Sequence, residues 1–246
     1  MKPGVLAGAA VVVSMAGAGQ AFAGVSGYAG GSYLNTNVDI GGLEGEDSGW
    51  GLEGMAAYSG MGLGLQVGAA YADSDAGDGA FAADGHVNFS PPFGRIGAFV
   101  AGGDASDATY WAVGGEGEVY VGPVTLAAAF GYASLEDDVT SWAVDGEVRF
   151  FATENLRIQG EAGYANIDAD IAEDTAITLG ASAEYKFGFM PVSIIVGYAH
   201  AELDETDLTT DSFSIGGRLS FGGSLKDRDR NGGGLPGLSS FTSSLI

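Results

Sequence analysis

Apolar residues alternate with polar or small residues over most of the chain, in segments of about ten residues. In the stretch 139–151, Val144 and Val148 share one parity, while Asp145 and Glu147 share the other. Successive side chains of a strand point to opposite faces, so each segment predicts a strand with one apolar and one polar face. Twelve segments show this pattern: near 24–36, 49–59, 63–72, 80–90, 93–102, 109–121, 124–134, 139–151, 156–167, 175–187, 192–201 and 211–222.

The connections between these segments are of two kinds. One set is short and rich in glycine and proline, as at Gly122-Pro123, and the other set is longer and acidic. Aromatic residues lie near both ends of many segments, at Tyr58, Phe89, Phe150, Phe187 and Phe221 and, at the opposite ends, at Tyr71, Tyr132, Tyr164 and Tyr198. Both features are typical of a barrel that crosses a membrane. A soluble β-sandwich also shows alternation, but here the second face is too polar to form a core. We therefore predict an all-β fold, an antiparallel up-and-down transmembrane β-barrel of about twelve strands.

The first residues predict secretion. Lys2 is followed by an apolar run from Val5 to Ala16 and by Ala21-Phe22-Ala23, which is the pattern of a signal peptide cleaved after Ala23. The run is shorter than the roughly 20 residues that cross a bilayer. We expect three parts: the signal peptide 1–23, a β-barrel over 24–222 in a bacterial outer membrane, and a flexible C-terminal tail over 223–246.

The charge balance excludes some partners. The chain has 32 acidic residues against 9 basic ones, which argues against binding to nucleic acid. The 44 glycines and the many acids would suit a disordered chain, but 46% of the residues are hydrophobic. No segment has 18 consecutive apolar residues, so no transmembrane helix is predicted.

Charged residues fix which face of each strand points inward. A Lys or Arg that faces lipid near the midplane costs about 2–4 kcal/mol, so the charged parity must face the lumen. This rule assigns to the lumen Glu53, Asp84, Arg95, Glu116, Glu118, Asp145, Glu147, Arg149, Arg157, Glu161, Glu184, Lys186 and Arg218. Two interpretations remain open: a structural ion-pair network at the short-turn end, or a charged eyelet through which ions pass.

The bore of the barrel depends on the lining. Eight strands enclose only side chains, whereas 16 to 18 strands leave a channel. Many residues of the inward parity are small, such as Ala112, Gly114 and Gly180. Small side chains beside polar groups leave space for water, so we predict a narrow aqueous pore.

The longer connections carry acids and no Lys or Arg. The acidic residues assigned to these outer loops include Glu44, Glu46, Asp47, Asp73, Asp75, Asp78, Glu136, Asp137, Asp138, Asp168, Asp170, Glu173, Asp174, Glu202, Asp204, Glu205 and Asp207. They are either solvated loops, or a vestibule that concentrates cations, or a site for divalent bridges to lipopolysaccharide phosphates.

The last segment carries an assembly pattern. Phe213, Ile215, Leu219 and Phe221 resemble the closing-strand signal that the barrel-assembly machinery reads, and the opening Val25-Ser26-Gly27-Tyr28 is similar to the first strands of bacterial porins. With the strand pattern, the chain after residue 23 resembles small Gram-negative outer-membrane β-barrels and porins. The resemblance implies passive diffusion of small hydrophilic solutes, with outer-membrane lipid, lipopolysaccharide and the assembly machinery as partners, and it leaves a homo-oligomer open. The alternative is a closed structural or surface-interaction barrel without transport. The acidic mouth predicts mild preference for cations.

Two further patterns resemble functional sites. His86, Asn88 and Ser90 are similar to the site residues of outer-membrane phospholipases, but same-face neighbours of one strand lie nearly 7 Å apart. We therefore expect no enzyme activity. Asp227 to Gly232 matches the first half of a calcium loop, but Leu238 stands where the closing glutamate belongs. We therefore predict neither a metal site nor a cofactor.

Overall fold

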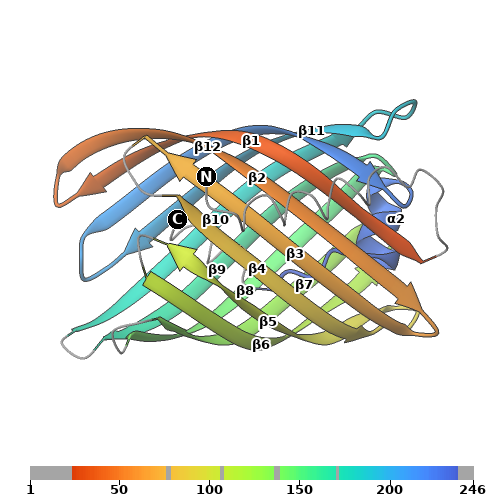
Figure 1. Ribbon diagram of the computed structural model, residues 1–246, viewed down its shortest axis with the longest axis horizontal. Helices are drawn as coiled ribbons and strands as arrows, with labels where there is room; N and C mark the ends of the chain where they lie inside the picture. The colour runs from red at the N-terminus through yellow and green to blue at the C-terminus, as the bar shows by residue number, and fades with distance from the viewer. Residues whose placement is uncertain (1–23, 76–78, 106–107, 136–138, 170–171, 238–246) are drawn as a thin grey trace.

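The computed structural model describes residues 24–75, 79–105, 108–135, 139–169 and 172–237. Its strands form one closed antiparallel barrel in which each strand pairs with its neighbours in sequence (Figure 1). The strands are β1 Val25–Ile40, β2 Leu43–Gly60, β3 Leu63–Ser74, β4 Ala80–Phe89, β5 Gly94–Ala105, β6 Ala108–Val121, β7 Val124–Leu135, β8 Val139–Thr153, β9 Leu156–Ala169, β10 Ala172–Lys186, β11 Val192–Leu203 and β12 Leu208–Phe221. The predicted twelve-stranded barrel is confirmed. The predicted signal peptide, 1–23, lies outside the described residues.

The barrel closes between its first and last strands. β1 and β12 pair from Gly27 with Phe221 to Ile40 with Leu208. This pairing leaves no free sheet edge, so all the backbone groups of the wall can be satisfied within it, as a bilayer requires. The closing-strand residues Phe213, Ile215 and Leu219 face outward, and their role in assembly stays a prediction.

The strands are longer at the loop end than the sequence predicts. β1 and β2 pair as far as Ile40 with Leu43 and are joined by Gly41 and Gly42, whose φ angles of 58° and 86° suit a tight hairpin turn. The prediction of a long loop over 37–48 is therefore wrong. Beyond the lipid both faces of a strand meet water, so polar residues occupy both parities and the alternation that marks a strand is lost.

This extension changes the setting of the acidic residues. Those that lie on strand ends rather than in loops are Glu44, Glu46, Asp47, Asp73, Asp168, Glu173, Asp174 and Glu202. Those in connections, as predicted, are Asp75, Asp204, Glu205 and Asp207. Asp78, Glu136, Asp137, Asp138 and Asp170 lie outside the described residues. The outer rim is therefore a projecting collar of strands with acidic side chains.

The outward face is apolar. Leu179 and Ile215 are 50% and 57% exposed at mid-strand, which only lipid can accommodate at this density of apolar residues. Near the loop end, ring pairs cross from strand to strand, such as Trp142 with Tyr164 at a centroid distance of 5.4 Å. A second aromatic set, with Tyr58, Phe89 and Phe150, lies near the short turns and is also exposed. The apolar band thus has an aromatic belt at each end.

The inward face carries the charges. Arg95, Glu118 and Arg149 are buried, whereas Val144 and Val148 on the other parity are exposed. Alanines line much of the wall above them, together with Phe99. The Phe99 ring covers Gly114, where an added Cβ would lie 2.5 Å from it. The glycines of the lumen therefore leave less space than the sequence analysis assumed, because side chains from neighbouring strands lie over them.

The C-terminal segment differs most from its prediction. Residues Leu225–Asn231 form a helix, α2, at the short-turn end of the barrel (Figure 1). Leu225, Arg228 and Asp229 are buried in it. The prediction of a flexible tail is therefore wrong for residues 224–237, which dock on the lumen wall, while 238–246 lie outside the described residues. In the described part of the chain, no helix is long and apolar enough to cross a membrane.

Candidate functional site

The chain enters the lumen through a sharp reversal after β12. Gly222 and Gly223 have φ angles of 90° and 113°, a region that side-chain-bearing residues rarely adopt. Ser224 then caps α2: its hydroxyl accepts from the Asp227 amide at 3.0 Å, and the Asp227 carboxylate accepts from the Ser224 amide at 3.1 Å. This capping box starts the helix at the point where the chain turns inward.

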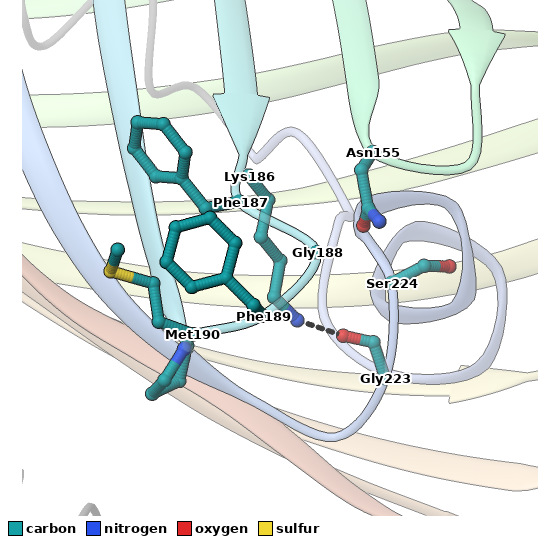
Figure 2. Close-up of a pocket in the computed structure, with 9 residues that line it drawn as sticks. Asn155, Lys186, Phe187, Gly188, Phe189, Met190, Gly223 and Ser224 are labelled. Carbon is teal, nitrogen blue, oxygen red and sulfur yellow. Dashed lines mark hydrogen bonds between the residues drawn. The ribbon is translucent and has the colours of Figure 1, made fainter.

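A cavity of about 410 Å³ borders this reversal. Figure 2 shows Lys186 reaching past the β10–β11 turn to donate a hydrogen bond to the Gly223 carbonyl, with Phe187, Phe189 and Met190 on the side of the turn away from Asn155. Lys186 was predicted to face the lumen charges. It binds the entry of the C-terminal segment instead.

Arg228 of α2 joins an ion-pair cluster on one side of the lumen. Its guanidinium lies 3.3 Å and 3.4 Å from the two carboxylate oxygens of Glu184 and 5.0 Å from the ring centre of Tyr28. Glu184 is fully buried and also accepts from Arg157 and Arg218, each at 3.0 Å. One carboxylate thus serves three guanidinium groups, one of which belongs to the C-terminal segment.

Asp229 makes the matching contact on the other side. Its carboxylate accepts from Arg149 at 2.8 Å and from the Thr125 hydroxyl at 2.7 Å. Its backbone carbonyl accepts from Arg95. Arg95 and Arg149 also pair with Glu118 of β6, at 2.7 Å and 3.3 Å. The Asp229 carboxylate is therefore buried, and each of its two oxygens accepts a hydrogen bond from the wall.

The glycine-rich stretch after α2 is bound to the lumen wall through hydrogen bonds of its backbone groups. Arg95 donates to the Gly232 carbonyl, and the Gln66 amide binds both Gly234 N, at 2.9 Å, and Leu235 O, at 3.4 Å. The Gly237 amide donates to Glu116 at 3.0 Å. Since Gln66 and Glu116 lie further from the short turns than Arg95 does, the chain climbs into the lumen. We call residues 224–237 the plug.

The wall charges form two groups. The first, cluster A, comprises Arg95, Arg149, Glu118 and Glu147, and it receives Asp229. The second, cluster B, comprises Arg157, Arg218, Glu53 and Glu184, and it receives Arg228. Each cluster has two cations and two anions before the plug contributes. Eight of the thirteen charges that the sequence assigns to the lumen thus lie in these two groups, where they are paired with one another.

A smaller group lies beside the end of the plug. His86 lies 2.7 Å from Glu116 and 2.8 Å from Asp84 through its two ring nitrogens. The Ser90 hydroxyl donates to Asn88 at 2.8 Å. The phospholipase-like arrangement is thus not formed, because His86 is held by two acids of the lumen wall. Among the described residues, no three acidic or histidine side chains converge as they would around a metal ion.

The remaining predicted lumen residues line the wall near these clusters. Glu161 accepts from Gln159 at 2.9 Å, and Asp145 is buried. The plug residues, above all Arg228, Asp229 and Gly232, are not among the predicted site residues. The signal that could have found them is Ser224-Leu225-Lys226-Asp227, followed by charged residues and by Gly232, which predicts a short capped helix.

Removing the charge of Glu184 should destabilise the barrel more than removing that of an exposed glutamate at the rim. Glu184→Gln removes the buried carboxylate that pairs with three guanidinium groups, of which Arg228 is itself buried, and breaking a buried pair from one side costs about 3–5 kcal/mol. We expect a clear fall in the temperature to which the sample must be heated, before electrophoresis, for the band of the folded protein to disappear. Glu154, which is 61% exposed and pairs with Lys226, is the control: Glu154→Gln should change stability by less than about 1 kcal/mol. Equal effects would contradict the buried cluster.

Comparisons with known proteins agree with this architecture. No protein-family model matches the chain, and no curated protein matches it. Similar solved structures include the COG4313 outer membrane channel from Pseudomonas putida F1 (TM-score 0.64, 9% identity, covering 83% of this chain and 98% of that one) and the NanC porin (0.60, 7%, 78% and 100%). The translocator domain of autotransporter NalP from Neisseria meningitidis is a further match (0.53, 13%, 86% and 93%). The chain therefore has the outer-membrane β-barrel fold that porins, channels and translocator domains share.

Proposed function

We propose that this protein is a bacterial outer-membrane channel for passive diffusion of small hydrophilic solutes, with a mild preference for cations, and that the plug holds it closed in the present conformation. The apolar outer band with its two aromatic belts supports a membrane location. The similarity to porins and a channel supports the channel class. In this proposal the plug is the gate of the channel.

The observation that carries this proposal is the chemistry of the plug contacts. Arg228 and Asp229 are held by ion pairs and hydrogen bonds, and residues 232–237 are held mostly through their backbone. Water and solute ions can replace such contacts, whereas an apolar core could not be exchanged in this way. The wall behind the plug is already paired within itself, so it need not collapse when the plug leaves.

The preference for cations follows from the distribution of charge along the barrel axis. Apart from Lys2, every Lys and Arg of the chain lies on the short-turn half of the wall or on α2: Arg95, Arg149, Arg157, Lys186, Arg218, Lys226, Arg228 and Arg230. The charged residues of the outer collar are all acidic. A mouth of one sign raises the local concentration of counter-ions, so cations should enter more readily than anions.

Reversal potentials under a salt gradient test the selectivity, recorded on a chain in which Arg228, Asp229 and Arg230 are alanine. We expect mild cation preference that grows at low ionic strength, where the Debye length reaches about 30 Å at 0.01 M. Neutralising Glu202, Asp204, Glu205 and Asp207 together should weaken the preference without abolishing conductance. Glu154→Gln at the opposite rim should leave it unchanged. Anion preference, or no response to salt, would contradict the vestibule.

A closed structural barrel is the second candidate. Arg228 and Asp229 are buried, and both are ion-paired. This arrangement favours the second candidate, because a plug that never leaves would also have its charges paired. The two candidates differ in one measurable respect. A gated channel conducts when the plug is removed, whereas a structural barrel stays closed because its wall side chains fill the bore.

A further inference from the structure

The plug occupies two neighbouring subsites of opposite charge preference. The carboxylate subsite consists of Arg149 and Thr125, which donate to the Asp229 side chain, while Arg95 donates to the Asp229 backbone carbonyl. The guanidinium subsite consists of Glu184 and Tyr28, and it holds Arg228. Arg149, Arg95, Thr125 and Glu184 are all buried, so the side chains that recognise the plug are fixed by the fold.

Charge balance restricts what else these subsites can hold. Clusters A and B are each neutral without the plug, with two guanidinium groups and two carboxylates. A ligand with a single charge would leave that charge uncompensated among buried side chains, which is costly. A ligand that brings a carboxylate to cluster A and a guanidinium to cluster B adds no net charge. The subsites therefore suit zwitterionic ligands.

The contacts beyond the subsites select a peptide. Gln66 binds one amide and one carbonyl of the plug backbone, and Glu116 accepts from a third peptide group, Gly237 N. At Gly232 an added Cβ would lie 1.7 Å from the Ser26 hydroxyl oxygen. The wall thus binds backbone groups of the plug, and a side chain at position 232 would fit only if Ser26 moved.

We infer that the floor of the lumen is a binding site for peptides in which a guanidinium side chain and a carboxylate side chain are adjacent and are followed by glycine, and that the chain's own plug occupies this site in cis. The inference rests on the proposed function, because an external peptide reaches the site only when the plug leaves it. Since the plug is tethered, it has a high effective concentration, and an external peptide binds weakly to the intact chain.

Peptide binding to the full chain in detergent tests this inference. The probe is a fluorescein-labelled peptide with the sequence of residues 228–237, and the protein carries Arg228→Ala, Asp229→Ala, Arg230→Ala and Gly232→Val, which unseat its own plug. We expect saturable binding, measured by fluorescence anisotropy, at least about tenfold tighter than to the wild type. A control peptide with Gln, Asn and Gln in place of the three charged residues should bind about tenfold more weakly or worse.

A wall variant and a second unseated chain complete the test. Thr125→Val removes one hydrogen bond to the ligand carboxylate and should weaken binding about tenfold. Gly232→Val alone keeps all the plug charges and serves if the fourfold variant does not assemble. Equal binding of the charged and neutral peptides, or no effect of Thr125→Val, would overturn the inference. The assay does not depend on ion flow: peptide binding without conductance would refute the proposed channel but not this site, and conductance without peptide binding would do the reverse.

Discussion

Replacing Arg228, Asp229 and Arg230 together by alanine in the full chain is expected to raise the current through the barrel in a planar bilayer by about tenfold or more. The substitutions remove the ion pairs with Glu184 and Arg149 and the hydrogen bonds to the Gly122 and Val124 carbonyls. Each hydrogen bond to a charged group contributes about 1.5–3 kcal/mol, and about 1.4 kcal/mol shifts a two-state equilibrium tenfold. The wall keeps its own ion pairs, so the open state is not penalised by stranded charges.

Lys226→Ala is the matched control. Lys226 is also basic and also on α2, but its side chain pairs with Glu154 at the exposed rim, at 3.0 Å. An exposed pair contributes about 0–1 kcal/mol, so this variant should conduct like the wild type. If the triple-alanine chain assembles yet carries no more current than Lys226→Ala, the plug is not the gate.

Placing arginines on the outer face should prevent stable insertion. Leu179→Arg together with Ile215→Arg puts two charges into the apolar band, at about 2–4 kcal/mol each near the midplane. Both side chains are at least half exposed on the outside of the barrel. We expect the folded, heat-modifiable band to disappear in the double variant, while the total amount of protein is unchanged.

The same charge on the inward parity should be tolerated. Ser182 and Ser214 lie on β10 and β12, three and one residues from the substituted positions, and point to the lumen side of the same strands. Ser182→Arg with Ser214→Arg should therefore retain the heat-modifiable band. Equal loss of the band in both pairs would show that the assigned parity is wrong.

The sequence predicts the wall well because one strong physical constraint acts on it. In lipid, a charged residue on the outer parity is so costly that every charged residue of β8 shares one side, as Asp145, Glu147 and Arg149 do. Strand number and facing can therefore be inferred from alternation alone. At the outer collar this constraint ends, and the extension of β1 and β2 to Gly41 and Gly42 could not be inferred from the pattern.

The plug was not predicted because it has no periodic pattern. Residues 232–237 bind through backbone groups, which every sequence has, and α2 is a single seven-residue helix. Its charged residues suggested a solvated tail. Only the lumen supplies the partners, Glu184 and Arg149, that make their burial favourable, and these lie on β10 and β8, 44 and 80 residues away in sequence.

The two groups of lumen charges can therefore serve both interpretations that the sequence left open. With the plug in place they form a structural network that includes Arg228 and Asp229. In the proposed channel, with the plug absent, the same side chains would border the pore. Which state the protein occupies then depends on a few exchangeable polar contacts rather than on refolding of the wall.

The most direct test locks the plug reversibly. A Cβ at Gly232 would lie 2.8 Å from the Ser26 Cβ, and disulfides join Cβ atoms about 3.8 Å apart, so a shift of about 1 Å allows a bridge. The chain has no cysteine of its own, so Ser26→Cys and Gly232→Cys, added to the triple-alanine chain, form the only pair. We expect no current while the pair is oxidised and a current of the released channel after a reductant is added to the same bilayer, with no response in either single-cysteine chain. Equal current before and after reduction would contradict gating by the plug, and no current in either state would contradict the channel itself.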